Sequence, residues 1–328
     1  MNKPAKYDVL GIGNAIVDVI APVEDDFLAN NAITRASMTL IDEERADSLY
    51  DVFPPASETS GGSAANTIAG CASLGARTAY FGKIANDELG EAFAHDLRAA
   101  GATFVTRPLC DGPKTARCLI AVTPDAQRSM STYLGASSLF GPSDLDPACI
   151  QDAAIIYMEG YLFDRDDAKA AFIQAAEIAA AAGRQTALTL SDLFCVERHR
   201  QAFLHLVRGH IDILFANEDE ILALYETTDL DSALAQVRAD CGFAAITRGA
   251  KGSILLSAGQ VETIAAEPVD KIIDTTGAGD LYAAGVLYGL SRALSLAECG
   301  RIGSIAAAEI ISHYGARAQT SLKLLAGD

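Results

Sequence analysis

The stretch that decides the fold is residues 153–190, AAIIYMEGYLFDRDDAKAAFIQAAEIAAAAGRQTALTL. It predicts an apolar strand (153–158), a helix (167–182) that begins with an aspartate and ends before a glycine, and a second strand (186–190). A helix, a strand and a helix are expected to follow at 197–207, 211–216 and 218–225. Such alternation is typical of a parallel sheet with helices on both faces. We therefore predict a doubly wound, mostly parallel α/β fold, with ligands beyond the carboxyl ends of the strands.

Two β-prone regions do not fit this alternation. They span residues 14–60 and 110–135, approximately, and the second region contains an expected hairpin whose two strands are 115–123 and 128–134. We expect both regions to form a small β lid over the site, within a single domain that spans residues 1–328. The other expected strands are 7–13, its continuation 14–20, 78–82, 243–247, 253–256 and one ending at 271–274, and the other helices are 61–75, 87–100, 279–292 and 296–312.

Composition limits the partners of the chain. A net charge of −18 over 328 residues would repel nucleic acid, and no apolar run is long enough to span a membrane. The seven cysteines are scattered and never spaced C-x-x-C, and the N-terminus carries no apolar signal region. We therefore expect reduced thiols in a cytoplasmic protein that binds neither nucleic acid nor membrane.

The strongest chemical signal is Asp274-Thr275-Thr276-Gly277-Ala278-Gly279-Asp280, which follows an apolar strand and opens a long helix. Gly277 and Gly279 let backbone N–H groups point at an anion, and the helix N-terminus adds its dipole. An aspartate in that first turn could act as the base in phosphoryl transfer to an alcohol. The alternative is that Asp280 only begins the helix. The chain lacks both the P-loop string and the third glycine of a dinucleotide fingerprint, so those two phosphate sites are disfavoured.

Two further strings suit a ligand site. Gly61 and Gly62 would let a ligand approach the backbone, and Asn66 offers both a donor and an acceptor. Asn217 and Glu220 would lie on one helix face, near magnesium-bound water. Spacing alone fits equally well with a glycine turn in the first case and an acidic helix cap in the second.

Together these strings resemble the ribokinase-like family of carbohydrate and nucleoside kinases. Residues 274–280 are similar to the C-terminal signature of the family and residues 61–75 to its N-terminal one, in the right order over nearly the whole chain. Within the family the chain looks most like the adenosine kinases, through the strings at 13–18, 128–136, 157–161 and 211–218.

The resemblance implies a role for each site residue. Asp280 would deprotonate a primary hydroxyl, and Gly277, Ala278 and Gly279 would form the anion hole. Arg128 would reach the transferring phosphoryl group from the lid. The substrate would be held by Asp18, Gly62, Ser63 and Asn66, with Asn14 nearby, and a base pocket could include Met38, Tyr133 and Tyr161, although such residues are more often simply core. ATP would lie beside Asn217, Thr247, Gly249 and Thr276. Mg²⁺ would be held through water by Asn217 and Glu220, and a monovalent cation such as K⁺, used by many relatives, is matched loosely by Asp274, Thr276 and Gly315.

The resemblance leaves the substrate open. The first expectation is ATP-dependent phosphorylation of the 5′-hydroxyl of a ribonucleoside, adenosine to AMP. The alternative is a sugar kinase for ribose, fructose or a keto-deoxy sugar acid, because Thr276 stands where adenosine kinases often have Asn. A third hypothesis, a binding protein that has lost catalysis, is disfavoured by Asp280 and its glycines. A homodimer through a lid edge also stays open.

Overall fold

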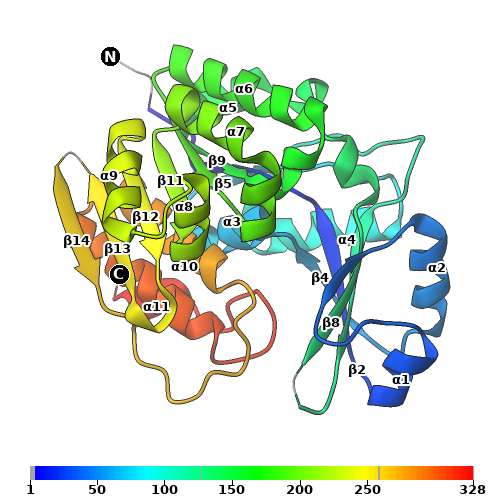
Figure 1. Cartoon of the computed structure of the whole chain (residues 1–328). Coiled ribbons are helices and arrows are strands. Elements are labelled where there is room, and N and C mark those ends of the chain that lie inside the picture. Colours follow the sequence, from blue (N-terminus) through cyan, green and yellow to red (C-terminus); the bar gives the residue numbers. More distant parts are fainter. Residues whose placement is uncertain (1–3, 126, 258, 328) are drawn as a thin grey trace.

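A computed structural model describes residues 4–125, 127–257 and 259–327. Its main sheet has nine strands in the order β14-β13-β12-β11-β10-β9-β1-β5-β6 (Figure 1). All pairs from β12 to β6 are parallel, while β13 and β14 join the edge antiparallel. The predicted doubly wound, mostly parallel sheet is therefore confirmed. The strands are β1 (Tyr7–Ile12), β5 (Thr78–Phe81), β6 (Ala102–Phe104), β9 (Ala153–Glu159), β10 (Gln185–Thr189), β11 (Ile213–Asn217), β12 (Phe243–Thr247), β13 (Ser253–Ser257) and β14 (Gln260–Ile264).

Helices cover both faces of this sheet, and each face has its own apolar core (Figure 1). The parallel strands are apolar on both sides because both sides are buried. One face packs against α5 (Pro147–Gln151), α6 (Asp166–Ala181), α7 (Leu193–His210), α8 (Glu218–Leu224) and α9 (Leu230–Asp240). The other packs against α3 (Ser63–Ser73), α4 (Glu88–Ala99), α10 (Ala278–Ser291), α11 (Leu296–Ile310) and α12 (Leu322–Ala326).

A second sheet of five strands, in the order β3-β8-β7-β2-β4, stands apart from the first (Figure 1). It is built from the two regions that did not fit the strand–helix alternation, and α1 (Asp25–Asn30) and α2 (Glu43–Val52) accompany it. β7 and β8 form the expected antiparallel hairpin, in which Val122 pairs with Arg128. The strands are β2 (Ile16–Pro22), β3 (Met38–Leu40), β4 (Ser57–Gly61), β7 (Ala116–Val122) and β8 (Arg128–Tyr133).

Some sequence-based expectations were wrong. The strand expected to end at residue 274 does not form: Ile272 is exposed, and the N–H of Ile273 donates to the carbonyl of Ile311 after α11 instead of to a strand. The continuation of the first strand is broken, since Asn14 lies between β1 and β2. The helix expected from residue 197 begins at Leu193, because Asp192 caps it by accepting from the N–H of Cys195. The edge strands β3, β6 and β14 and the helix α9 were not predicted.

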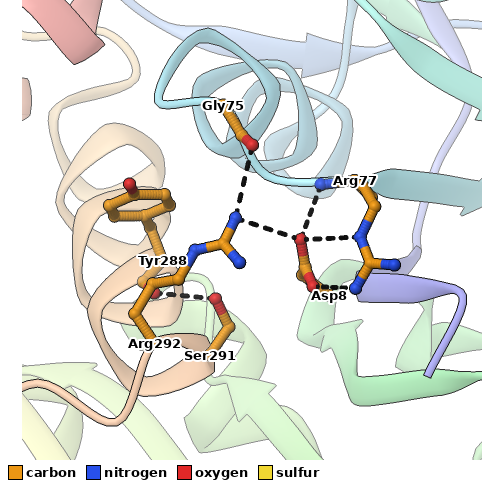
Figure 2. Close-up of polar contacts among 6 residues, drawn as sticks. All are labelled: Asp8, Gly75, Arg77, Tyr288, Ser291 and Arg292. Atoms are coloured by element: carbon orange, nitrogen blue, oxygen red, sulfur yellow. Dashed lines mark hydrogen bonds and ion pairs between the residues drawn. The ribbon is translucent and has the colours of Figure 1, made fainter. Parts of the chain in front are cut away.

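A polar cluster around the buried carboxylate of Asp8 joins the far end of α10 to the sheet (Figure 2). The carboxylate of Asp8 in β1 accepts bonds from the backbone N–H and the guanidinium of Arg77, and Arg292 lies 3.4 Å from the same carboxylate. Burial tends to raise the pKa of Asp8, but the two arginines outweigh it and hold the pKa below its usual range. The helix that begins beside the proposed base is thereby tied at its other end to the first strand.

No helix among the described residues is both long and apolar enough to cross a bilayer.

Candidate active site

A cavity of about 700 Å³ lies at the carboxyl ends of β9, β10, β11 and β12, where the small sheet faces the start of α10. Parallel sheets leave their ligand crevice at this edge. The predicted site residues that border it are Asn14, Asp18, Met38, Gly62, Ser63, Asn66, Tyr161, Asn217, Glu220, Thr247, Thr276, Gly277, Ala278, Gly279 and Asp280. Residues more than 250 positions apart in the sequence thus share one cavity.

Asp280 lies in the first turn of α10 and is held by two residues of α3. Ser63 Oγ donates to Asp280 Oδ1 at 2.6 Å, and Asn66 Nδ2 donates to Oδ2 at 2.9 Å. Burial raises the pKa of Asp280 above its ordinary value, while these two bonds and the charge of Arg317 limit the rise. The carboxylate is therefore fixed in direction and made more basic than a solvated one, as a proton acceptor requires.

The turn before α10 has the shape that an anion site needs. Gly277 caps the helix with φ +78°, a left-handed conformation that favours glycine, and a side chain there would lie 3.0 Å from Ala316. Gly279 borders open space, because an added Cβ would meet no atom within 4 Å. The backbone at the N-terminus of α10 is thus accessible from the cavity, and the helix dipole favours negative charge there.

Asp18 projects from β2 onto Gly61, the last residue of β4. A Cβ on Gly61 would lie 2.3 Å from Asp18 Oδ2, so only glycine leaves room for this carboxylate. Burial raises the pKa of Asp18 to about 6, Arg317 and Arg128 oppose the rise, and the neighbouring charge of Asp280 adds to it. Two acidic groups, Asp18 from the small sheet and Asp280 from α10, therefore face one cavity.

Glu159 is a site residue for which the sequence analysis predicted no role. It ends β9, is 1 % exposed and also borders the cavity. Its Oε2 accepts from the N–H of Ala64 at 2.8 Å, and its Oε1 accepts from Asn14 Nδ2 at 2.8 Å. Burial raises the pKa of Glu159 to about 7, although these bonds oppose the rise. Its sequence signals were its place at the end of an apolar strand and within the 157–161 string that resembles adenosine kinases, and neither assigned it a role.

Arg128 reaches the main domain from the small sheet. Its guanidinium forms an ion pair with Asp274, and its Nη1 donates to Thr276 Oγ1 at 3.2 Å. Asp274 also accepts from the N–H and hydroxyl of Thr276 and from the N–H of Gly315 at 3.1 Å. Both oxygens of Asp274 are therefore occupied by donors from the protein itself.

Asn217 and Glu220 cap α8 reciprocally. Glu220 Oε2 accepts from the N–H of Asn217 at 2.9 Å, and Asn217 Oδ1 accepts from the N–H of Glu220 at 2.8 Å. Burial raises the pKa of Glu220 to about 7. In the part of the chain that the structure describes, no group of three or more acidic, His or Cys side chains could hold a metal directly. A divalent ion here would have to be held partly by water and by its phosphate ligand.

Residues 30–323 match the pfkB family of carbohydrate kinases. The chain belongs to this family. A pfkB carbohydrate kinase transfers a phosphoryl group to an alcohol, so the chain is a phosphotransferase that uses ATP and an alcohol acceptor. The carboxylate of Asp280, the glycine turn and the cavity described above are the kinds of groups that this reaction needs.

Individual relatives resemble this kinase over almost their full length. It is similar to the crystal structure of adenosine kinase from Sinorhizobium meliloti, with 51% identity, a TM-score of 0.90 and coverage of 98% of this chain and 99% of that one. It is also similar to a probable sugar kinase from Rhizobium etli, with 48% identity, a TM-score of 0.91 and 98% of each chain covered. An adenosine kinase from Saccharomyces cerevisiae is 27% identical over 93% of this chain and 94% of its own length.

Some predicted site residues of this kinase do not border the cavity. Tyr133 turns away, and its hydroxyl donates to Glu43 of α2. Gly249 lies in a short 3-10 turn beyond β12 and does not line the cavity either. Arg128, Asp274 and Gly315 lie beside the glycine turn, behind Thr276. Sequence reasoning did not identify the cavity wall beside Tyr161, which consists of Asp164, Thr189, Ser191, Asp192, Cys195 and Arg198.

Proposed function

We propose that this kinase transfers the γ-phosphoryl group of ATP to the 5′-hydroxyl of a ribonucleoside, with adenosine as the first candidate. The observation that carries the proposal is the contrast between the two sides of one cavity. Its floor is polar, with Asp18, Asn66 and Asp280. The rest of the wall from the small sheet is largely apolar and includes Ile16, Met38, Leu40, Ile120, Met130 and Leu134 beside Cys118 and Thr132. A ribose suits the floor and a flat base suits the wall.

The floor has an open position for a substrate hydroxyl. Asn66 Oδ1 is buried without a hydrogen-bond partner among the described residues, although Asn66 Nδ2 is held by Asp280. A buried acceptor without a partner is costly, and a hydroxyl donor from the acceptor substrate would satisfy it. The other groups proposed to contact the ribose are Asp18, the buried Asn14, and the backbone at Gly62 and Ser63.

In this proposal Asp280 takes the proton of the 5′-hydroxyl as that oxygen forms its bond to the γ-phosphorus and the bond from phosphorus to ADP breaks. The backbone of Gly277, Ala278 and Gly279 faces the charged oxygens of the transferring group. Arg128 supplies positive charge beside them. The small sheet excludes water from the cavity and so limits hydrolysis of ATP, which is the lid role predicted for it.

The donor side of the cavity is the end bordered by Asn217, Glu220 and Thr247. Mg²⁺ would be held there through water by Asn217 and Glu220, and it would neutralise charge on the phosphates. A monovalent cation fits the described residues less well, since Asp274 is already neutralised by Arg128 and bonded by Thr276 and Gly315.

The test is ATP consumption by the purified protein against a panel of nucleosides and sugars, with phosphorus NMR to locate the new phosphate. Adenosine converted to its 5′-monophosphate, at a kcat/KM well above that for ribose or fructose, supports the proposal. Preference for a bare sugar would replace it with the sugar kinase alternative. Size-exclusion chromatography with light scattering tests whether the chain forms a homodimer through a lid edge, the possibility left open by the sequence; Met38 and Leu40 are exposed on edge strand β3.

A further inference from the structure

Arg317 lies behind the active site, in the segment between α11 and α12, and does not border the cavity. Its Nη1 donates to the carbonyl of Ala65 at 2.8 Å, and its Nη2 donates to the carbonyl and hydroxyl of Ser60, both at 2.7 Å. Ser60 and Ala65 are the two ends of the glycine turn that contains Gly61, Gly62 and Ser63. One guanidinium therefore holds both ends of the turn that faces the substrate.

Three carboxylates gather on the same turn. Asp18 lies on Gly61, Asp280 accepts from the hydroxyl of Ser63, and Asp96 of α4 accepts from the N–H and hydroxyl of Ser60. The Nε of Arg317 is buried without a hydrogen-bond partner among the described residues, so no direct bond neutralises it on that side. The positive charge thus lies behind the turn, and two of the carboxylates lie in the cavity in front of it.

We propose that Arg317 is a positioning residue that keeps Asp280 and Asp18 ionised at the same time, so that one can accept a proton while the other binds substrate hydroxyls. The proposal rests on the roles given to these two aspartates in the proposed function. Two neighbouring carboxylates repel each other, and a fixed cation near both reduces the cost of charging the pair. Arginine suits this position because it stays charged even when buried.

The electrostatic surroundings agree with this geometry. Burial raises the pKa of both aspartates, and the charge of Arg317 opposes the rise in each. Burial also lowers the pKa of Arg317, while Asp96, Asp18 and Asp280 oppose that change. The other titratable groups that face Asp280 are acidic or phenolic: Asp18 from β2, Tyr80 from β5, Tyr157 and Glu159 from β9, and Tyr161 from the turn after it.

The test is the pH dependence of kcat, measured with the best acceptor from the substrate panel, for Arg317→Gln and Arg317→Lys. The glutamine variant should move the acidic limb of the pH–kcat profile to higher pH by about one unit, so that kcat falls about tenfold at pH values below the limb and recovers at alkaline pH. The lysine variant keeps the charge and should leave the limb near its wild-type position. Arg301→Gln, which removes an exposed arginine bonded to the carbonyl of Ala326, is the matched control and should leave the profile unchanged.

Asp96→Asn gives an independent test if the glutamine variant does not fold. Without the negative charge of Asp96, the positive charge of Arg317 stabilises the ionised form of Asp280 more strongly, so the acidic limb should move to lower pH. If Arg317 has a purely structural role, the glutamine and lysine variants should lose the same fraction of kcat at every pH, and the acidic limb should not move. This result would overturn the proposal. If the wild-type enzyme prefers a sugar, the proposed nucleoside substrate is wrong but this inference still stands, because the pH dependence of kcat can be measured with either acceptor.

Discussion

Arg128 and Asp274 form an ion pair that joins the small sheet to the glycine turn of the main domain. Their side chains are only 10% and 7% exposed, so the pair is largely desolvated. Loss of one partner from such a pair leaves an uncompensated charge. The pair places the guanidinium beside the glycine turn, with Nη1 3.2 Å from Thr276 Oγ1, and so beside the proposed position of the transferring phosphoryl group.

We expect Arg128→Lys to lower kcat about tenfold or more while acceptor affinity stays almost unchanged. A guanidinium can contact Asp274, Thr276 and a phosphoryl oxygen together, whereas an ammonium acts as a point charge and cannot replace this fork. Steady-state kinetics, with acceptor affinity measured separately by calorimetry, will test this. A kcat equal to that of the wild type would show that Arg128 has no role in the transfer.

Asp280→Asn is expected to lower kcat by on the order of 10²–10⁴ with little change in nucleotide affinity, because the variant loses a proton acceptor and keeps its shape. The amide can still accept from Ser63 or Asn66, so the fold of the turn should survive. The readout is kcat together with ATP affinity. Turnover close to that of the wild type would remove Asp280 from the role of base.

For Asp18→Ala we expect KM for the acceptor to rise far more than KM for ATP, since each lost charge-assisted bond costs about 1.5–3 kcal/mol. The same carboxylate should give a pH signature in the wild type. Its pKa is raised to about 6, so acceptor affinity should fall as pH falls below this value and the binding form becomes protonated. Equal effects of the substitution on both substrates would contradict this assignment.

Much of the fold was predictable from the sequence because the pattern of apolar residues along the chain follows which positions are buried. The parallel strands are buried on both faces and read as apolar runs, and their helices end at glycines or begin at capping aspartates. β3 was not predicted, because it has three residues, is exposed throughout and, among the residues that the structure describes, pairs only with β8. Its existence depends on a partner about 90 residues away, which no local pattern records.

The site was predictable where chemistry is local to a motif, as in residues 274–280. It was not predictable where a residue acts through the tertiary fold. Glu159 binds the backbone of Ala64 and the side chain of Asn14, and Arg317 binds Ser60, more than 250 positions earlier. Neither residue has a spacing that distinguishes it from a surface charge. Tyr133 shows the reverse case, since its aromatic ring was expected in the base pocket and instead faces α2.

Glu220→Gln should raise the Mg²⁺ concentration needed for half-maximal activity several-fold, because the variant loses the carboxylate proposed to order the metal-bound water. Glu218→Gln is the matched control. Glu218 is two residues away on the same helix but is paired with Arg248, and its removal should leave the Mg²⁺ dependence unchanged. Activity titrated with Mg²⁺ at fixed ATP distinguishes the two, and identical curves for both variants would contradict the metal role.

Glu159 should make the folded protein less stable as pH rises towards neutrality. Its pKa is about 7 in the folded chain and 4.5 when unperturbed, so between these values the folded state binds the proton more tightly. The associated stability is complete below about pH 4.5 and is lost as pH rises through 7, by on the order of 3 kcal/mol. Glu159→Gln removes this titration, so its free energy of unfolding should vary less with pH from 5 to 7.

Urea unfolding at several pH values measures this difference directly. Glu220 and Asp18 also have raised pKa values, so the free energy of unfolding of the Glu159→Gln variant should still depend on pH. Only the part of this dependence that comes from Glu159 should be lost. Glu177→Gln, on the exposed face of α6, is the control and should follow the wild-type curve within about 0.5 kcal/mol. If the curves of Glu159→Gln and the wild type run parallel from pH 5 to 7, Glu159 is already ionised in the folded protein, and the bonds from Ala64 and Asn14 outweigh its burial.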